Sequence, residues 1–347
     1  MCSLLQRMRS VVVILILFFG ASSLSHAQTL GGSAVFQFLK LPSSALQSAT
    51  GRLNVSLSAP DVGATLINPA LLHDELHGTV GASFLNLFGA GRALHAAGVN
   101  KLTRWKATSV AGVTFVDYGQ VPQTDAAGNE LGTFSAREYA LQAGFSKSYK
   151  ERWYYGGTLK FAGAQYGRFS SFGLMADVGL RYSDTVHGLQ AGFVMRNAGA
   201  QLRRFETASE ELPFEVVAGV TKKLEKAPLA FSLTGQYLHR LRVSYPDSLT
   251  AAGRSTVSLG RELFNHLIVA THVYISSQIQ VHAGYNALRA FELRNNNFGS
   301  GLNGFSGGLL VQLKAVQIQY ASTWYNRRPT NQVSLNVQLA RPGTSGL

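Results

Sequence analysis

Apolar and polar residues alternate with a period of two along most of the chain, from about residue 78 to its end. Between Phe172 and Tyr182 the even-numbered residues are all apolar, whereas the odd-numbered ones are glycines, Met175, Asp177 and Arg181. Successive side chains of a β-strand point to opposite faces, so this stretch predicts a strand with one apolar and one polar face. Strands of soluble sandwiches also have two unlike faces, so the number and length of the strands must decide the architecture.

Fourteen segments carry this alternation, and most are long enough to cross a bilayer as strands. Such a crossing takes about 9–11 residues, whereas strands of soluble proteins usually have about 5–6. The pattern therefore predicts an all-β fold, a transmembrane antiparallel β-barrel of about fourteen strands. The expected strands span residues 79–88, 91–100, 104–117, 135–146, 152–163, 172–182, 187–197, 213–221, 228–239, 264–275, 278–286, 305–313, 316–325 and 331–339.

The connections between these segments alternate in length, as in outer-membrane barrels, which have short periplasmic turns and longer external loops. The long connections are all odd-numbered and span residues 118–134, 198–212, 241–263 and 287–304, although the first and last odd-numbered connections are short. Every even-numbered connection is short. Both ends of the barrel are therefore expected at the periplasmic side of the outer membrane. Aromatic residues near several strand ends match the girdles of such barrels.

Residues 1–27 are expected to be a secretory signal peptide. Arg7 and Arg9 precede an apolar run over residues 11–19, and small residues lead to a cleavage site after Ala27. That run is too short to cross a bilayer as a helix, although an uncleaved anchor helix is the alternative.

Residues 28–77 are expected to form an N-terminal plug or periplasmic segment, and residues 78–347 the barrel. Within the plug segment we expect a short helix that ends at Ala49, a short strand over residues 52–57, and a turn or helix that starts at Asn68. A barrel of fourteen strands is wide enough that something must fill or line it.

Composition and charge agree with export. Charged residues make up 14% of the chain, against about 25% in ordinary soluble domains. Removal of residues 1–27 takes away Cys2, the single cysteine, and lowers the formal net charge from +13 to +11 through loss of two arginines. For an exported chain, this charge favours lipid headgroups, lipopolysaccharide phosphates or an acidic partner over nucleic acid. Two arginine pairs in expected external loops are candidates for phosphate contacts or simply for a solvated rim: Arg203-Arg204 and Arg327-Arg328.

One short motif comes close to a metal signature, the stretch His73-Asp74-Glu75-Leu76-His77. The zinc protease motif needs glutamate directly after the first histidine, and here that place holds Asp74. A polar linker into the first strand is the favoured interpretation. The other histidines are scattered and suggest no catalytic triad. We therefore predict no catalytic, cofactor-binding or metal site, no cofactor, and no enzymatic activity.

Several stretches together resemble the PorQ family of outer-membrane components of the type IX protein secretion system of Bacteroidota. They cover nearly the whole expected mature chain and include residues 41–45, 66–72, 171–177, 212–215 and 222–228. The resemblance implies a FadL-like barrel that neither transports nor catalyses by itself. It would belong to an attachment complex that couples secreted cargo to lipopolysaccharide. Its expected partners are PorZ-like, PorU-like and PorV-like proteins, with the PorZ-like surface protein anchored by the external loops.

Two other functions stay open. The first is a FadL-like uptake channel for a hydrophobic small molecule, with residues 28–77 as its plug and a lateral opening in the wall. The glycine pairs Gly156-Gly157 and Gly307-Gly308 permit such a kink, but they equally permit close packing. The Asn-Pro-Ala stretch at residues 68–70 belongs to the wider FadL-like group as well. The second is an outer-membrane enzyme, for which no polar residues converge in the sequence.

Overall fold

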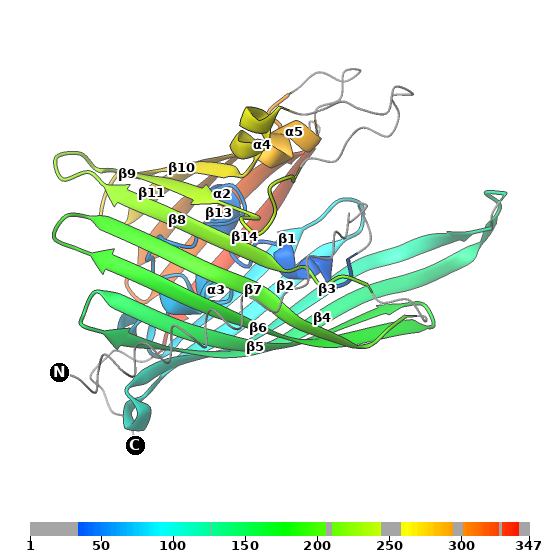
Figure 1. Ribbon diagram of the computed structural model, residues 1–347, viewed down its shortest axis with the longest axis horizontal. Helices are drawn as coiled ribbons and strands as arrows, with labels where there is room; N and C mark the ends of the chain where they lie inside the picture. Colours follow the sequence, from blue (N-terminus) through cyan, green and yellow to red (C-terminus); the bar gives the residue numbers. More distant parts are fainter. Residues whose placement is uncertain are drawn as a thin grey trace. The chain divides into compact units, whose positions relative to one another are not determined.

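A closed barrel of antiparallel strands dominates the computed structural model of the protein, in which each strand pairs with its sequence neighbours and β1 pairs with β14 (Figure 1). The structure describes residues 34–125, 127–205, 210–243, 258–293, 301–325 and 328–339, so the expected signal peptide lies outside the described residues. The strands are β1 (Thr79–Asn86), β2 (Arg92–Leu102), β3 (Ala107–Thr124), β4 (Glu130–Tyr149), β5 (Trp153–Tyr166), β6 (Phe169–Asp184), β7 (Leu189–Arg203), β8 (Glu215–Lys223), β9 (Leu229–Gly235), β10 (Leu267–Tyr274), β11 (Ile279–Asn286), β12 (Phe305–Leu313), β13 (Val316–Tyr325) and β14 (Arg328–Gln338).

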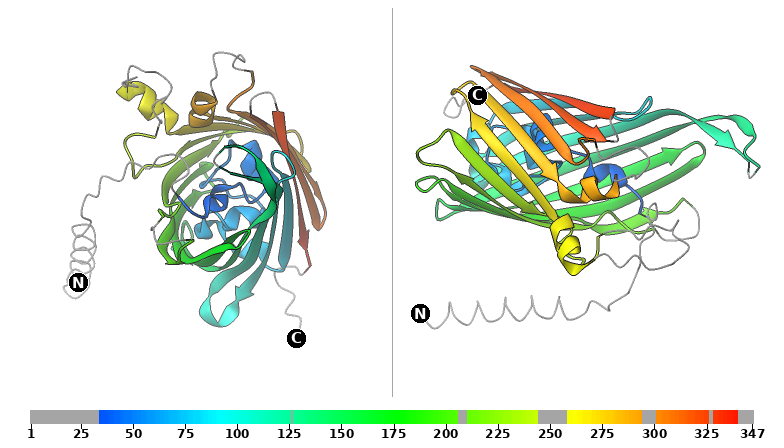
Figure 2. Two further views of the ribbon diagram at one scale, coloured as in Figure 1. Left: turned by 90° about the vertical axis from the view of Figure 1, so that its right-hand side faces the viewer. Right: turned by 90° about the horizontal axis from the view of Figure 1, so that it is seen from above.

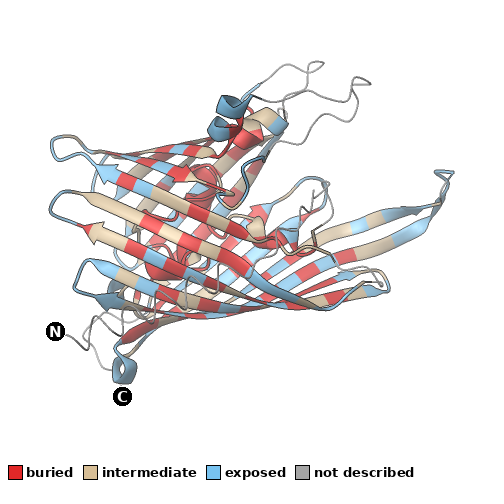
Figure 3. Cartoon of the chain, viewed as in Figure 1, coloured by how far each residue is buried: buried red, intermediate tan, exposed pale blue. Residues whose placement is uncertain are grey.

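The wall of the barrel is apolar outside and polar inside, the reverse of a soluble protein. Along β6, Leu174 and Val178 are 48% and 52% exposed, whereas Asp177 and Arg181 are buried, as their alternation predicts. Figure 3 shows buried and exposed residues alternating in the same way along the other strands. A closed barrel pairs its strand hydrogen bonds internally, so this surface is suited to lipid. The described helices are all too short or too polar to cross a bilayer.

All fourteen predicted strands are present, and the largest difference concerns the expected loop over residues 118–134. Most of that loop continues β3 and β4 as a hairpin that projects beyond the rest of the wall (Figure 1). At its tip the Asp125 carboxylate accepts hydrogen bonds from the backbone N–H groups of Ala127 and Asn129, each at 2.9 Å. Both faces of the hairpin are largely exposed, so the apolar alternation that reveals the other strands fades there.

The described part of the N-terminal segment, residues 34–77, lies inside the barrel, and we call it the lumenal segment. In the end-on view of Figure 2 it lies within the ring of strands. It contains short helices and turns joined by irregular chain: η1 (Gln37–Lys40), α2 (Ala45–Ala49), α3 (Val62–Thr65), η2 (Pro69–Leu71) and η3 (Asp74–Leu76).

Two of the three local predictions for this segment are confirmed. The helix α2 ends at Ala49 and begins after Ser44, whose hydroxyl accepts a hydrogen bond from the N–H of Gln47. Asn68 caps η2 in the same way, as the predicted turn or helix there requires. The predicted strand over residues 52–57 is wrong, because the Asn54 side chain accepts hydrogen bonds from the N–H groups of two following residues and turns the chain.

Candidate functional site in the barrel lumen

The wall carries glycine at many of the places where the lumenal segment comes closest. At Gly284 in β11, an added Cβ would lie 2.5 Å from the backbone N of Gly51 and 2.7 Å from the backbone O of Ala49. None of the six wall glycines named in the next sentence has a φ in the left-handed region. Lack of space, and not backbone conformation, therefore excludes a side chain at these positions. Six strands distributed around the barrel contribute a glycine whose Cβ would meet the lumenal segment at under 3.0 Å: Gly81, Gly112, Gly179, Gly192, Gly284 and Gly308.

A buried carboxylate ties the lumenal segment to the wall. Glu215, at the start of β8, is fully buried and uses both of its carboxylate oxygens. One oxygen accepts from the Arg52 guanidinium at 2.6 Å, and the other lies 3.5 Å from that of Arg196 in β7. Arg52 also donates to the side chain of Gln236, and Arg196 donates to the backbone O of Leu39. A buried carboxylate is stable only with such partners, so these contacts fix the segment at residues 39–52.

A second buried ion pair belongs to the wall itself. Lys160 in β5 lies 2.5 Å from Asp177 in β6, and both side chains are buried. The register of β6 and β7 shifts beside this pair, where Asn197 adopts a φ of 56°. Its N–H donates to Asp177 and its side-chain oxygen accepts from Lys160. The bulge thus turns an extra polar residue into the lumen to complete the pair.

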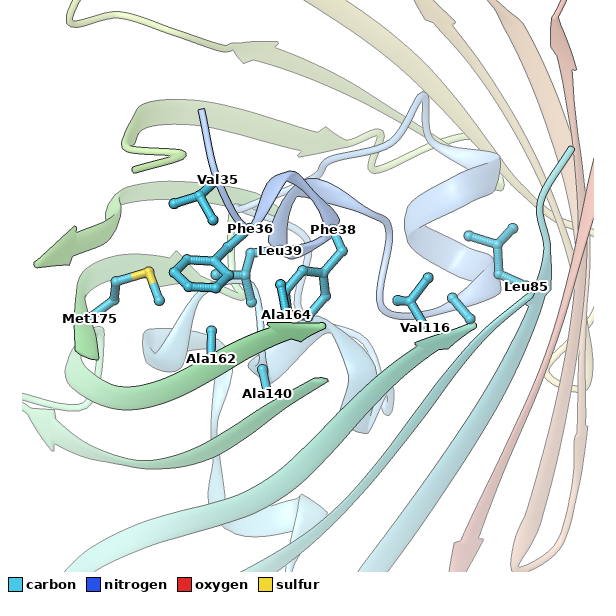
Figure 4. Packing of buried hydrophobic residues seen from close by; sticks show 11 residues of the cluster. Val35, Phe36, Phe38, Leu39, Leu85, Val116, Ala140, Ala162, Ala164 and Met175 are labelled. Carbon is cyan, nitrogen blue, oxygen red and sulfur yellow. The ribbon is translucent and has the colours of Figure 1, made fainter. Parts of the chain in front are cut away.

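An apolar cluster lies in the lumen and includes residues of β3 and β4, the strands that continue into the projecting hairpin (Figure 4). Phe36 and Phe38 of the lumenal segment enter it, and the wall there has small side chains such as Ala140 and Ala162. Phe36 is almost fully buried although its φ is 57°, a strained value for a residue with a side chain. Close packing around its ring maintains this conformation. We use the name apolar cluster for Val35, Phe36, Phe38, Leu39, Leu85, Ala93, Val116, Ala140, Ala162, Ala164 and Met175.

Aromatic rings border this cluster at the ends of the strands next to the projecting hairpin. The buried Glu138 carboxylate accepts hydrogen bonds from the hydroxyls of Tyr118 at 2.5 Å and Tyr166 at 2.8 Å. The ring of Tyr166 stacks on that of Phe205, with centroids 5.1 Å apart. All three rings are partly buried and pack on the apolar cluster. Because the carboxylate binds the hydroxyls, the ring faces are available for apolar contacts.

The predicted metal-like stretch lies at the opposite end of the barrel, where the chain enters β1. His73 and His77 make separate contacts, with the backbone O of Leu71 and the backbone N–H of Lys101. Asp74 accepts from the Lys101 ammonium at 2.6 Å. Partial burial alone would raise the pKa of Asp74, but hydrogen bonds from Lys101 and a threonine keep that pKa below its usual value. Across the described ranges, no three His, Cys, Asp or Glu side chains are grouped to hold a metal ion.

A histidine pair in the lumen escaped the sequence analysis. His272 in β10 and His282 in β11 lie directly opposite each other, with their Nδ1 atoms 2.9 Å apart, and Ser232 contacts Nε2 of His272. His272 lies four residues before the predicted turn at residues 276–277 and His282 lies five residues after it, so the sequence placed them at similar heights but did not show that they pair. Of the predicted arginine pairs, Arg203 ends β7, Arg328 begins β14 and Arg327 lies outside the described residues.

Comparison with known proteins identifies the fold and no family. No protein-family model matches the chain, and no curated protein matches it in sequence. The fold is similar to that of CymD, a monoaromatic hydrocarbon channel, with a TM-score of 0.54 and 11% identity over 87% of this chain and 99% of that one. It is also similar to the toluene transporter TbuX of Ralstonia pickettii, with a TM-score of 0.52 and 11% identity over 86% and 98% of the two chains. For a deletion mutant of the monoaromatic hydrocarbon channel TodX the TM-score is 0.50, with 14% identity over 85% and 97%.

The closed barrel and the similar folds establish the structural class of the protein. The chain is a closed transmembrane β-barrel of fourteen antiparallel strands, as its sequence predicts, with the fold of CymD and TbuX. Its apolar exterior and its strand number are those of barrels that reside in the outer membrane, which is its location. At such low identities, the similarity concerns the fold and leaves the cargo open.

Proposed function

We propose that this barrel is a non-enzymatic uptake channel for small hydrophobic molecules. The observation that carries this proposal is the apolar cluster inside the lumen, bordered by aromatic rings on its external side. A water-filled pore has a polar interior, whereas a site that captures hydrophobic solutes is apolar with a few placed polar groups. The similarity in fold to hydrocarbon channels supports the same function.

The structure suggests how such a channel is closed. The rings of Phe36 and Phe38 fill the space between the small wall residues, so a hydrophobic molecule must displace them to pass. Among the described residues, their stretch of chain has mainly apolar neighbours, and the N–H of Val35 donates a hydrogen bond to the backbone O of Glu211, in the connection between β7 and β8, at 2.9 Å. The charged contacts of Arg52 lie further along the chain and need not break when this stretch moves.

The proposal is tested by uptake of radiolabelled toluene into cells that lack other hydrocarbon channels. Phe38→Ala removes one of the two closing rings and is expected to raise the uptake rate, whereas Ala140→Trp fills the cluster and is expected to abolish uptake. Phe145→Ala and Leu141→Trp are matched controls, since both residues lie on the lipid-facing side of β4. Toluene uptake that equals that of cells without the barrel, or that ignores both cluster variants, contradicts the proposal. Heat-modified mobility on gels verifies that each variant folds.

A second candidate is the anchoring role implied by the PorQ resemblance. The contacts of the lumenal segment with glycines around the wall and with Glu215 favour it, because they describe a lumen that stays filled. The hairpin of β3 and β4 would then offer a surface for a PorZ-like protein, with PorU-like and PorV-like proteins in the same complex. Affinity purification of the detergent-solubilised barrel separates the two functions. A co-purified large surface protein with sortase-like components supports the anchor, and a barrel recovered alone with an apolar molecule supports the channel.

A further inference from the structure

The helix α4 (Leu259–Asn265), in the connection between β9 and β10, has an apolar face that no described residue covers. At 100° per residue, Leu259, Gly260, Leu263 and Phe264 lie on one side of the helix. The three large residues among them are 69%, 55% and 48% exposed. A continuous apolar stripe is therefore turned away from the protein.

The opposite side of α4 is polar and buried. Glu262 and Asn265 are 4% and 1% exposed. The Glu262 carboxylate accepts a hydrogen bond from the backbone N–H of Val243 at 3.1 Å, and the backbone O of Asn265 accepts from the Gln236 side chain at 3.4 Å. A helix on the surface of a soluble protein has the reverse arrangement, with its apolar stripe toward the core. The barrel wall has the same inverted arrangement as α4, with apolar side chains exposed and polar side chains buried.

The position of α4 connects its apolar stripe with the lipid-facing wall. In the end-on view of Figure 2 the helix lies outside the ring of strands. It runs directly into β10, whose outward-facing Val269 is 44% exposed in the wall. Arg261, at the edge of the stripe, lies 5.1 Å above the Phe291 ring of the neighbouring helix α5 (Ala287–Glu292). The stripe thus continues the apolar exterior at the external ends of the strands.

We propose that α4 is an interfacial anchor whose apolar stripe lies among the acyl chains of the outer leaflet. Lipid is the occupant because the stripe is continuous with a surface that is already in lipid, and because a basic residue borders it where headgroup phosphates lie. Interfacial helices bury their apolar side by roughly 5–10 Å, a depth that the exposed side chains of one helix face reach. This inference does not depend on what the barrel transports.

The experiment is spin labelling of the barrel in phosphatidylcholine vesicles. The label is attached to Phe264→Cys in a chain that also carries Cys2→Ser, and its accessibility is measured to oxygen, which dissolves in lipid, and to a polar nickel complex, which stays in water. Val269→Cys provides the lipid-facing control, and Ala127→Cys at the tip of the hairpin provides the water-facing control.

The proposal expects an oxygen-to-nickel accessibility ratio at residue 264 that approaches that of the label at residue 269. A ratio equal to that at residue 127 would place α4 in water and overturn it. Exclusion of both reagents would also overturn it, because a protein surface, such as a second copy of the chain, would then cover the stripe. Leu263→Cys, on the same side of the helix, repeats the measurement should the first label disturb folding.

Discussion

The fit between the lumenal segment and the wall makes Gly284→Ala an informative substitution. The new Cβ would lie 2.5 Å from the backbone N of Gly51 and also 2.5 Å from the carbonyl carbon of Thr50. These are backbone atoms, so no side chain can rotate away. To restore an ordinary contact of 3.4 Å from 2.5 Å, the lumenal backbone must retreat by about 0.9 Å.

That retreat has a cost that follows from the neighbouring hydrogen bonds. The Asn286 side chain donates to the backbone O of Gly51 at 3.0 Å, and the Ser306 hydroxyl donates to the backbone O of Ala49 at 3.0 Å. A shift of this size lengthens both beyond hydrogen-bonding distance, and each is worth about 0.5–1.5 kcal/mol. Overpacking by one methyl group adds about 1–3 kcal/mol. We therefore expect Gly284→Ala to lower the free energy of unfolding by about 2–6 kcal/mol.

The assay is equilibrium unfolding in urea of the barrel folded into vesicles, followed by tryptophan fluorescence. Gly307→Ala is the matched control on the adjacent strand β12, where the nearest atom to the new Cβ is 3.7 Å away. That control is expected to be neutral or to stabilise by up to about 1 kcal/mol, because alanine reduces the entropy of the unfolded chain. Equal stabilities of the two variants would refute the close fit between the lumenal segment and β11.

Two further predictions concern the buried charges. Lys160→Met leaves Asp177 as a buried carboxylate without its ammonium partner, and it should lower the free energy of unfolding by about 3–5 kcal/mol in the same urea assay. The double variant that also carries Asp177→Leu should recover part of that loss, because no buried charge then remains unpaired. Arg52→Met should lower the free energy of unfolding by less, about 1–3 kcal/mol, because Arg196 still lies beside the Glu215 carboxylate. Since Arg52→Met also loosens the lumenal segment, it should raise ion conductance in planar bilayers, and an unchanged conductance would contradict the role of this contact.

The strands could be predicted from the sequence because the membrane imposes a regular pattern on them. Wherever one face meets lipid and the other meets the polar part of the lumen, as at Leu174 and Asp177, apolar and polar residues alternate. The pattern failed where that environment ends. The outer half of the hairpin between Asp117 and Arg137 is exposed on both faces, so turn-like residues conceal strand structure there. In the lumenal segment, Leu53 and Val55 alternate with Asn54, yet the asparagine side chain bends the chain instead.

The contacts between the lumenal segment and the wall could not be predicted from the sequence alone. Arg52 and Glu215 are separated by 163 positions, and their contact depends on how the lumenal segment is threaded through the barrel. The glycines that accommodate this segment look like ordinary strand glycines until the atoms opposite them are known. Gly307 and Gly308 are neighbours in the sequence, but only the second meets the lumenal segment, at the Cβ of Ala49. Which face of a strand each glycine occupies was predictable, whereas its partner was not.

The lumenal segment therefore consists of two parts that differ in how they are held. From Leu39 onward, backbone contacts with wall glycines and the ion pairs of Glu215 fix the chain. Before Leu39, mainly apolar contacts hold it, and the strained backbone of Phe36 opposes them. Apolar contacts can be exchanged for those of a hydrophobic ligand with little loss, whereas a buried ion pair cannot be broken without a large penalty. If the barrel opens to an apolar molecule, the opening therefore begins at Phe36 and Phe38, while the rest of the segment stays in place.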